Sequence, residues 1–290
     1  MDYNYLMQIT EEIFQAFLWC ETKSYLKISG TIGLRREFSE WERFLAEDFW
    51  QKCSQRLLSN FWQDECFVGT PSPQELENKK YRLVINCVVQ AQRVQSHIQA
   101  LERLPSPGNT KHNRYIPIRL IPKEKITEFD KLLLSFDAFV LFTTSGRMPL
   151  FGKIIHGIEQ KTVRIKLDRL MKSTESIIAK ITAQQVAAKE PPLILNKHCA
   201  ECEFQLQCRQ SARQKDELTL LSGMTEKERS KLHGKGLFTI TQLSYTFRPR
   251  RRPKCSLSKP NKYYASLKAL AFREQKIHIA GKRELDTGQT

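Results

Sequence analysis

Three cysteines in the second half of the chain, Cys199, Cys202 and Cys208, constrain its folding more than any other feature. Thiolates separated by two and then five residues converge on one soft metal centre more readily than they form a disulfide. A fourth ligand is needed. The candidates are Cys20, far away in the sequence, and His198, which directly precedes Cys199. Such a site holds either a structural zinc or an iron–sulfur cluster, and the spacing alone does not choose between them.

The remaining cysteines have no ligand spacing, and we interpret each as an ordinary buried or tolerated thiol. Eight cysteines in 290 residues are also too few and too unevenly placed for the disulfide framework of a secreted protein. The four without an assigned role are Cys53, Cys66, Cys87 and Cys255.

The chain is strongly basic, since 47 Lys and Arg outnumber 31 Asp and Glu and give a formal net charge of +16. This excess favours polyanions as partners, with nucleic acid first and an anionic membrane surface second. The sequence has no apolar run of about 18 residues, and its first residues lack the layout of a signal peptide. We therefore expect a soluble, cytoplasmic protein, whose 40% apolar residues suffice for a core.

Helical periodicity dominates the first 60 residues. Residues 10–25 are expected to form one helix with Cys20 on its inward face. A second helix is expected to begin at a capping box at Ser39. The apolar stripe of this second helix is expected to lie in the core. It comprises Trp41, Phe44, Leu45, Phe49, Cys53 and Leu57.

The periodicity then changes to that of a mixed α/β fold. Three strands in succession are followed by a helix that Gly146 ends, by two more strands and by a long helix that ends before Pro191. The strands are expected at 81–89, 96–104, 115–121, 151–156 and 162–167, and the helices at 127–143 and 168–189.

A second, small module is expected at 216–243, where two short helices flank the turn Gly234-Lys235-Gly236. Glycines between short helices let backbone N–H groups reach phosphate oxygens, as helix-hairpin-helix modules do. An ordinary helical hairpin accounts for the pattern equally well. A basic run follows and favours phosphate contact, although it also suits a solvated linker. Its charged residues are Arg248, Arg250, Arg251, Arg252 and Lys254.

Taken together, these segments resemble the RecB-like branch of the PD-(D/E)XK nuclease superfamily, which includes the CRISPR-adaptation exonucleases. The match is closer to putative RecB-like nucleases that carry a helix-hairpin-helix-like segment and then a C-terminal ribonuclease H-like domain. The matching stretches span nearly the whole chain and are 17–26, 101–103, Tyr115, 146–147, 196–202, 208–209 and 234–243.

The resemblance implies a restriction-endonuclease-like core with a four-iron, four-sulfur cluster on Cys20, Cys199, Cys202 and Cys208. It favours Cys20 over His198 and iron over zinc. The implied organisation is a nuclease-fold domain at 1–212, a helix-hairpin-helix-like module at 213–246 and a basic tail at 247–290. The resemblance implies that this tail is the start of the ribonuclease H-like domain, so the chain is expected to be truncated.

The catalytic positions of this superfamily hold acids for Mg²⁺ or Mn²⁺ and a lysine beside them. When this pattern is laid on the sequence, Gln99 takes the position of the first acid, Arg119 that of the second acid and Ile121 that of the lysine. Arg119 would repel a metal ion but could contact a phosphate. We therefore expect a catalytically degenerate protein that binds DNA in recombination, repair or mobile-element processing.

Two other functions compete with this one. The first is an active metal-dependent DNA exonuclease or endonuclease that uses non-standard acids such as Glu102, Asp130 or Asp137. The second is a structural adaptor for proteins, which an absence of DNA affinity even at low salt would favour.

Overall fold

The structure, a computed structural model, describes residues 7–34, 37–77, 81–105, 114–187, 189–248 and 263–278. The chain folds as two compact units, Met1–Pro192 and Leu193–Thr290. This division differs from the boundary near residue 212 that the sequence suggested. Residues 193–212 group with the second unit because they bond to it, for example through Leu195 N–H to Thr219 Oγ1 (3.2 Å) and Glu217 N–H to the Ala212 carbonyl (2.9 Å).

The first unit is a mixed α/β fold, as the order of its segments predicts. Its described strands form a seven-stranded sheet in the order β2-β3-β4-β5-β6-β7, with β1 beside β4. β3, β4 and β5 are antiparallel neighbours, and β6 lies parallel to β5 because the helix between them returns the chain across the sheet. The strands are β1 (Ile9–Thr10), β2 (Cys66–Val68), β3 (Leu83–Ala91), β4 (Val94–Leu104), β5 (Arg114–Ile121), β6 (Phe151–His156) and β7 (Lys161–Lys166).

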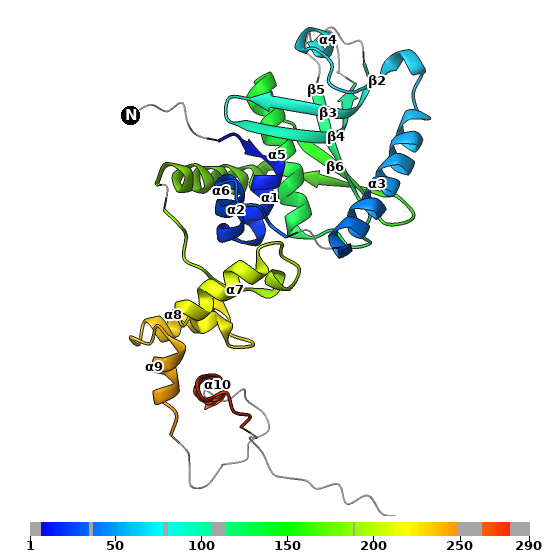
Figure 1. Cartoon of the computed structure of the whole chain (residues 1–290). Helices are drawn as coiled ribbons and strands as arrows, with labels where there is room; N and C mark the ends of the chain where they lie inside the picture. The colour runs from blue at the N-terminus through cyan, green and yellow to red at the C-terminus, as the bar shows by residue number, and fades with distance from the viewer. Residues whose placement is uncertain are drawn as a thin grey trace, which may run out of the picture. The chain divides into compact units, whose positions relative to one another are not determined.

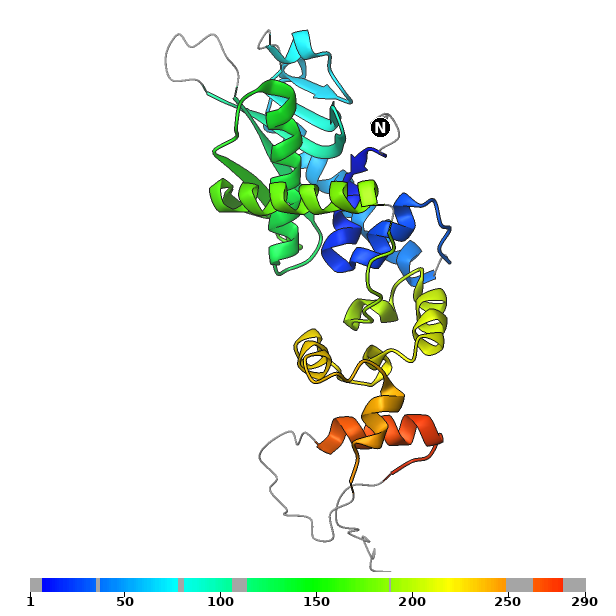
Figure 2. The same cartoon turned by 90° about the vertical axis from the view of Figure 1, so that its left-hand side faces the viewer.

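Helices cover both faces of this sheet (Figure 1). The helices α1, α2, α5 and α6 gather on one face, where α6 crosses α5 (Figure 2), and α3 lies on the other. Their bounds are α1 (Glu11–Trp19), α2 (Glu21–Ile28), α3 (Glu37–Leu58), α4 (Pro73–Glu77), α5 (Glu128–Ser145) and α6 (Asp168–Ala187), with a 3-10 turn η2 at Gln63–Glu65.

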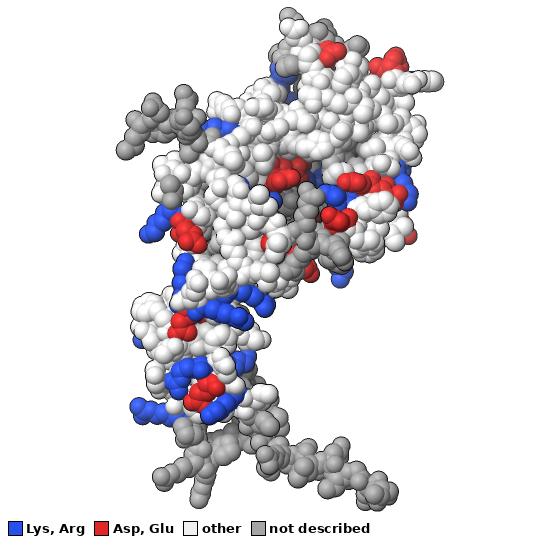
Figure 3. All heavy atoms as spheres, viewed as in Figure 1, with Lys and Arg blue, Asp and Glu red and all other residues white. Residues whose placement is uncertain are grey.

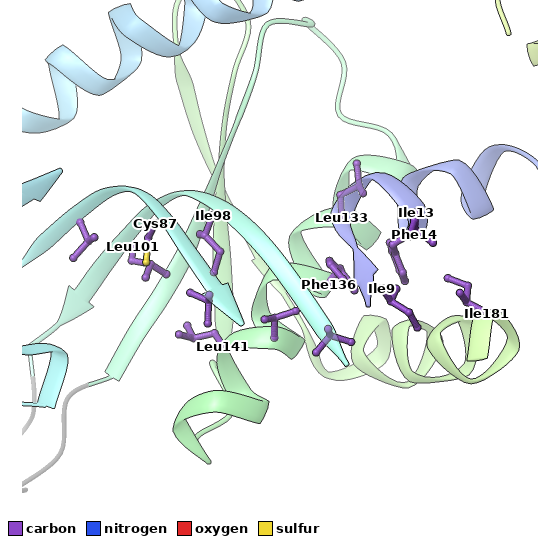
Figure 4. Packing of buried hydrophobic residues seen from close by; sticks show 14 of the residues in the cluster. Ile9, Ile13, Phe14, Cys87, Ile98, Leu101, Leu133, Phe136, Leu141 and Ile181 are labelled. Carbon is purple, nitrogen blue, oxygen red and sulfur yellow. The ribbon is translucent and has the colours of Figure 1, made fainter. Parts of the chain in front are cut away.

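The main core lies between the sheet and the α1–α5–α6 group (Figure 4). Phe14 of α1 stacks on Phe136 of α5 with ring centroids 4.5 Å apart. Ile98 and Leu101 of β4 and Ile181 of α6 belong to the same buried cluster. A second cluster lies under α3, where Phe49 and Trp50 pack against β3, β4 and β5.

Local signals place α5 as predicted. Thr127 caps the helix, because its hydroxyl accepts the Asp130 N–H while the Asp130 carboxylate accepts the Thr127 N–H. Gly146 ends the helix in the left-handed region, with φ 67°.

The prediction of one helix over residues 10–25 is wrong at Cys20. This residue adopts an extended conformation (φ −166°, ψ 123°) and forms both the end of α1 and the start of α2. Cys20 is half-buried and therefore lies in a link between helices, not on a helical face.

The predicted core role of the α3 stripe is wrong for its first half. Cys53 is buried, but Trp41 and Phe44 are 57% and 66% exposed, and Leu45 is exposed as well. The helix begins at Glu37, and the side chain of Ser39, the predicted cap, lies outside the described part of the chain. Helical spacing therefore identified a continuous apolar face, of which the sheet covers only one end.

The second unit is a small helical assembly around a core of its own. Its elements are η3 (Lys197–Ala200), α7 (Gln205–Gln214), η4 (Leu218–Leu220), α8 (Glu226–His233), α9 (Ile240–Tyr245) and α10 (Tyr263–Glu274). Leu218, Leu221, Ile240 and Leu243 pack around Ala269 of α10, which is fully buried. Part of the segment assigned to a basic tail is thus a helix that completes this core.

None of the described helices combines the length and the apolar character needed to cross a membrane.

Candidate functional site

The catalytic positions suggested by the resemblance lie on two neighbouring strands. Gln99 lies on β4, and Arg119 and Ile121 lie on β5. Arg119 points toward α1 and α5, where it bonds to their carboxylates, and Ile121 packs on the same side against Leu134 of α5. Gln99 instead lines a pocket with residues of α3. The three positions therefore do not meet on one face of the sheet.

A change of face within β3 contributes to this separation. Ile85 and Cys87 are two residues apart and would share a face in a regular strand. Ile85 packs in the cluster under α3, whereas Cys87 packs in the cluster under α5. Asn86, between them, adopts the left-handed conformation with φ 63°.

The paired strand β4 changes face at the corresponding place. Ile98 belongs to the cluster under α5, and Ala100 belongs to the cluster under α3. Gln99 lies between them, and its Oε1 accepts the backbone N–H of Leu120 at 2.5 Å. Gln99 thus bridges to β5 at the point where the described pairing of β4 with β5 ends.

Arg119 is held in a buried ionic network. Its Nε and Nη2 donate to the two carboxylate oxygens of Asp137 at 3.1 Å each, and its Nη1 donates to Glu11 Oε1 at 2.8 Å. Ser96 Oγ donates to Asp137 Oδ1 at 2.5 Å. Arg119 is 7% exposed and Asp137 is 1% exposed. The sequence suggested that Arg119 could contact a phosphate. Its position in the structure speaks against this, because its donors bind carboxylates inside the protein.

The electrostatics of this network favour a permanently charged guanidinium. Burial lowers the pKa of Arg119, but Asp137 and Glu11 raise it by more, so that it lies above its usual value. Burial raises the pKa of Asp137, while Arg119 and Ser96 oppose the rise. A cation of the protein itself thus occupies the position where the resemblance places metal ligands.

Asp137 is the network residue that sequence reasoning misplaced. Asp137 was a candidate for a non-standard catalytic acid, yet its carboxylate is buried and binds Arg119. The available signal was its position in the apolar run Phe136-Asp137-Ala138, because a buried carboxylate needs a charged or hydrogen-bonding partner.

The other carboxylates considered for catalysis also have partners. Glu102 pairs with Lys153 of β6. Asp130 caps α5 through the backbone and hydroxyl of Thr127. Neither is arranged as one of a pair of acids on neighbouring strands.

In the second unit, the turn at Gly234-Lys235-Gly236 uses its backbone donors internally. The Gly234 N–H donates to Ser230 (3.0 Å), the Lys235 N–H to Leu232 (2.9 Å) and the Gly236 N–H to His233 (2.9 Å). These groups were expected to reach phosphates, but here they bond to carbonyl groups in the last turn of α8. The exposed side chain of Lys235 remains a candidate for phosphate contact.

Positive charge is concentrated in the second unit. Residues 193–290 contain 20 Lys and Arg against 9 Asp and Glu, whereas residues 1–192 contain 27 against 22. Figure 3 shows Lys and Arg side chains gathered on the visible face of this unit, with a few acids between them. Arg248 is the last residue described before a gap, and Arg250, Arg251, Arg252 and Lys254 lie outside the described residues.

The cysteine triad lies at the start of the second unit. Cys199 belongs to η3, Cys202 follows this turn, and Cys208 lies on α7. All three are half-buried. The Asn196 N–H donates to Cys199 Sγ at 3.3 Å, a type of hydrogen bond that stabilises a ligating thiolate.

This donor set fits a thiolate-bound metal centre in its chemistry. Within the described ranges, no three His, Cys, Asp or Glu side chains lie close enough to hold a metal ion as they stand. Cys20 belongs to the first unit and the triad to the second. The four-cysteine ligand set therefore stays a prediction.

Comparison with protein-family models gives no match, and neither does comparison with curated proteins.

Proposed function

We propose that this chain is a DNA-binding protein with a degenerate RecB-like nuclease fold. The charge distribution carries the proposal, because the second unit has 20 basic and 9 acidic residues. Such an excess binds a phosphate backbone without reading the bases. The biological setting would be recombination, repair or mobile-element processing, as the resemblance implies.

The order of elements in the first unit supports the restriction-endonuclease-like fold. Three antiparallel strands are followed by α5 and then by β6, which is parallel to β5. The first four of these elements form the strand–strand–strand–helix core on which the resemblance rests.

The Arg119 network supports the loss of catalysis. A metal-dependent nuclease needs carboxylates that are available to Mg²⁺ or Mn²⁺. Asp137 and Glu11 instead bind Arg119, whose guanidinium would repel a divalent cation. In this proposal the acids stabilise the fold and the bound DNA remains intact.

The cluster is part of the same proposal. Cys199, Cys202 and Cys208, with Cys20 as the fourth ligand, would hold a four-iron, four-sulfur cluster or a zinc ion. Bound metal would contribute to the folding free energy of the chain and need not take part in any reaction.

DNA affinity can be tested by fluorescence anisotropy with a labelled oligonucleotide between 50 and 200 mM salt. Lys231 and Lys235 are exposed in the second unit. Changing both to Glu should weaken binding by about tenfold or more. The slope of the logarithm of the binding constant against the logarithm of the salt concentration should fall in magnitude by about two, because each lost phosphate contact removes about one released counterion.

The matched control introduces the same change of charge in the first unit. Lys172 and Lys180 are exposed on α6, and Lys172→Glu/Lys180→Glu should leave affinity nearly unchanged. Absence of binding at 50 mM salt would overturn the proposal. Degradation of DNA in Mn²⁺ that is lost in Glu102→Gln would instead establish the active nuclease as the function.

A further inference from the structure

A pocket of about 340 Å³ lies in the first unit between α3 and the sheet. This volume is at the small end of the range for small-molecule sites, about 300–1,000 Å³. Its walls come from α3 and from β3, β4 and β5, with a contribution from β2. Its polar and aromatic lining residues include Glu47, Trp50, Gln51, Asn86, His97 and Gln99.

The strained residue of β3 lies in the wall of this pocket. Asn86 has a φ of 63° in the middle of a strand, in the left-handed region that residues other than glycine rarely adopt. Its Oδ1 accepts a hydrogen bond from His97 Nε2. Strain that is retained in this way is a common feature of binding sites.

The groups on the sheet side are fixed but keep unused hydrogen-bonding capacity. Since His97 uses Nε2 to bind Asn86, the Nδ1 of its ring is left as a second hydrogen-bonding position. Gln99 is anchored through its Oε1, and its amide NH₂ supplies two donors. On the helix side, Trp50 of α3 is held in place, because its indole N–H donates to the Leu120 carbonyl at 3.3 Å.

The charge of the lining determines which ligand fits. Among the lining residues there is no Lys or Arg, and the only charged side chain is that of Glu47. A phosphate group would therefore find no cation here, whereas a neutral ring with donors and acceptors on its edge would match the amides and the imidazole. Nucleobases have this chemistry.

Exposed aromatic residues continue from the pocket along the same helix. Phe44, Glu47 and Gln51 follow one another at spacings of three and four residues on α3, so they share one side of the helix. Trp41 lies one turn before Phe44. Both aromatic side chains are more than half exposed, and such side chains form platforms on which unpaired bases stack.

We propose that this pocket receives one unpaired base of a single-stranded nucleic acid, while Phe44 stacks against a neighbouring base. This inference rests on the proposed function, because phosphate attraction by the basic unit supplies most of the affinity. The pocket adds a preference for single strands, since a base within a duplex cannot enter it without being unpaired.

The experiment compares the affinity of the full chain for a single strand and for a duplex of the same sequence. Phe44→Ala and Gln51→Leu should each weaken single-strand binding, by about tenfold for Phe44, and leave duplex binding unchanged. Trp62→Ala is the matched control, because Trp62 is 78% exposed but does not line the pocket. A strand with one photoreactive base should also cross-link to residues of this pocket.

The outcomes separate the two proposals. If the wild-type chain binds neither nucleic acid, both proposals fail. If it binds both and the Phe44 and Gln51 variants behave like the Trp62 variant, only the base pocket is overturned. Parallel losses on single strand and duplex, or cross-links confined to the second unit, would also overturn the pocket.

Discussion

Arg119 of β5 and Asp137 of α5 form a bidentate ion pair, in which Nε and Nη2 of Arg119 each donate to one carboxylate oxygen of Asp137 at 3.1 Å. The pair connects the centre of the sheet to the helix that covers it. Because both side chains are buried, neither can exchange its partner for water. The cost of removing one partner therefore differs from the cost of removing both.

We expect Asp137→Ala to lower the free energy of unfolding by about 3–5 kcal/mol, because it leaves the Arg119 charge buried beside a single remaining carboxylate. The double variant Arg119→Met/Asp137→Leu should recover part of this loss, since it places apolar side chains in an apolar layer. Urea unfolding of Asp137→Ala, of the matched single variants Arg119→Met and Asp137→Leu, and of the double variant measures both effects. If the double variant lost as much unfolding free energy as the single variants lose together, the two side chains would not be coupled as a pair.

The alkaline stability should depend on Tyr115. Its hydroxyl donates to the Tyr81 carbonyl at 2.8 Å, and burial raises its pKa to about 12 from 10.0. A raised pKa in the folded state means that this contribution is complete below pH 10 and is lost as the pH rises through 12.

Tyr115→Phe should therefore be less stable than the wild type by about 1 kcal/mol at pH 8, through loss of the hydrogen bond. The difference should narrow between pH 10 and pH 12, where only the wild type has this group to ionise. Urea unfolding of both chains at several pH values gives the comparison. A difference that stays constant with pH would show that Tyr115 is not buried as described.

Gly152 of β6 provides a test of the packing between sheet and helix. A Cβ at this position would lie 2.9 Å from side-chain carbons of Leu134 on α5. We expect Gly152→Ala to destabilise the fold by about 1–3 kcal/mol through overpacking. In a Leu134→Ala background the same change should cost almost nothing, so a double-mutant cycle measured by thermal unfolding reports the contact. Equal costs in both backgrounds would contradict it.

The metal centre is tested by composition and colour. Protein purified without oxygen should be brown and absorb near 400 nm, as iron–sulfur proteins do. Cys20→Ser and Cys208→Ser should each lose iron and stability, whereas His198→Ala should retain both. A colourless protein with one bound zinc would overturn the choice of iron. Iron loss confined to the His198→Ala variant would show that His198, and not Cys20, is the fourth ligand.

Cysteines outside the ligand set serve as controls in this experiment. Burial raises the pKa of Cys53 and of Cys87 to about 11, so both thiols stay protonated at neutral pH and are poor ligands. Cys66→Ser is the mildest control, because this thiol is only half-buried. Iron content should be unchanged in all three Ser variants, although the two buried sites can lose some stability.

The sequence alone placed strands β3 to β7 and helices α5 and α6 close to their observed bounds. The strand at 151–156 and the start of α5 at Thr127 agree with the prediction, because alternation, caps and turn residues are signals within a few neighbouring residues. The mixed α/β class follows from the order of these elements.

The tertiary structure alone decided what each face contacts. Glu11 meets Arg119 across 108 residues of sequence, and Gln99 lies away from Arg119 because both β3 and β4 change face beside Asn86. Periodicity likewise could not tell that the sheet leaves Trp41 and Phe44 exposed. Burial and pairing depend on residues that are distant in sequence, so local patterns specify an element and its faces, while packing selects the partner of each face.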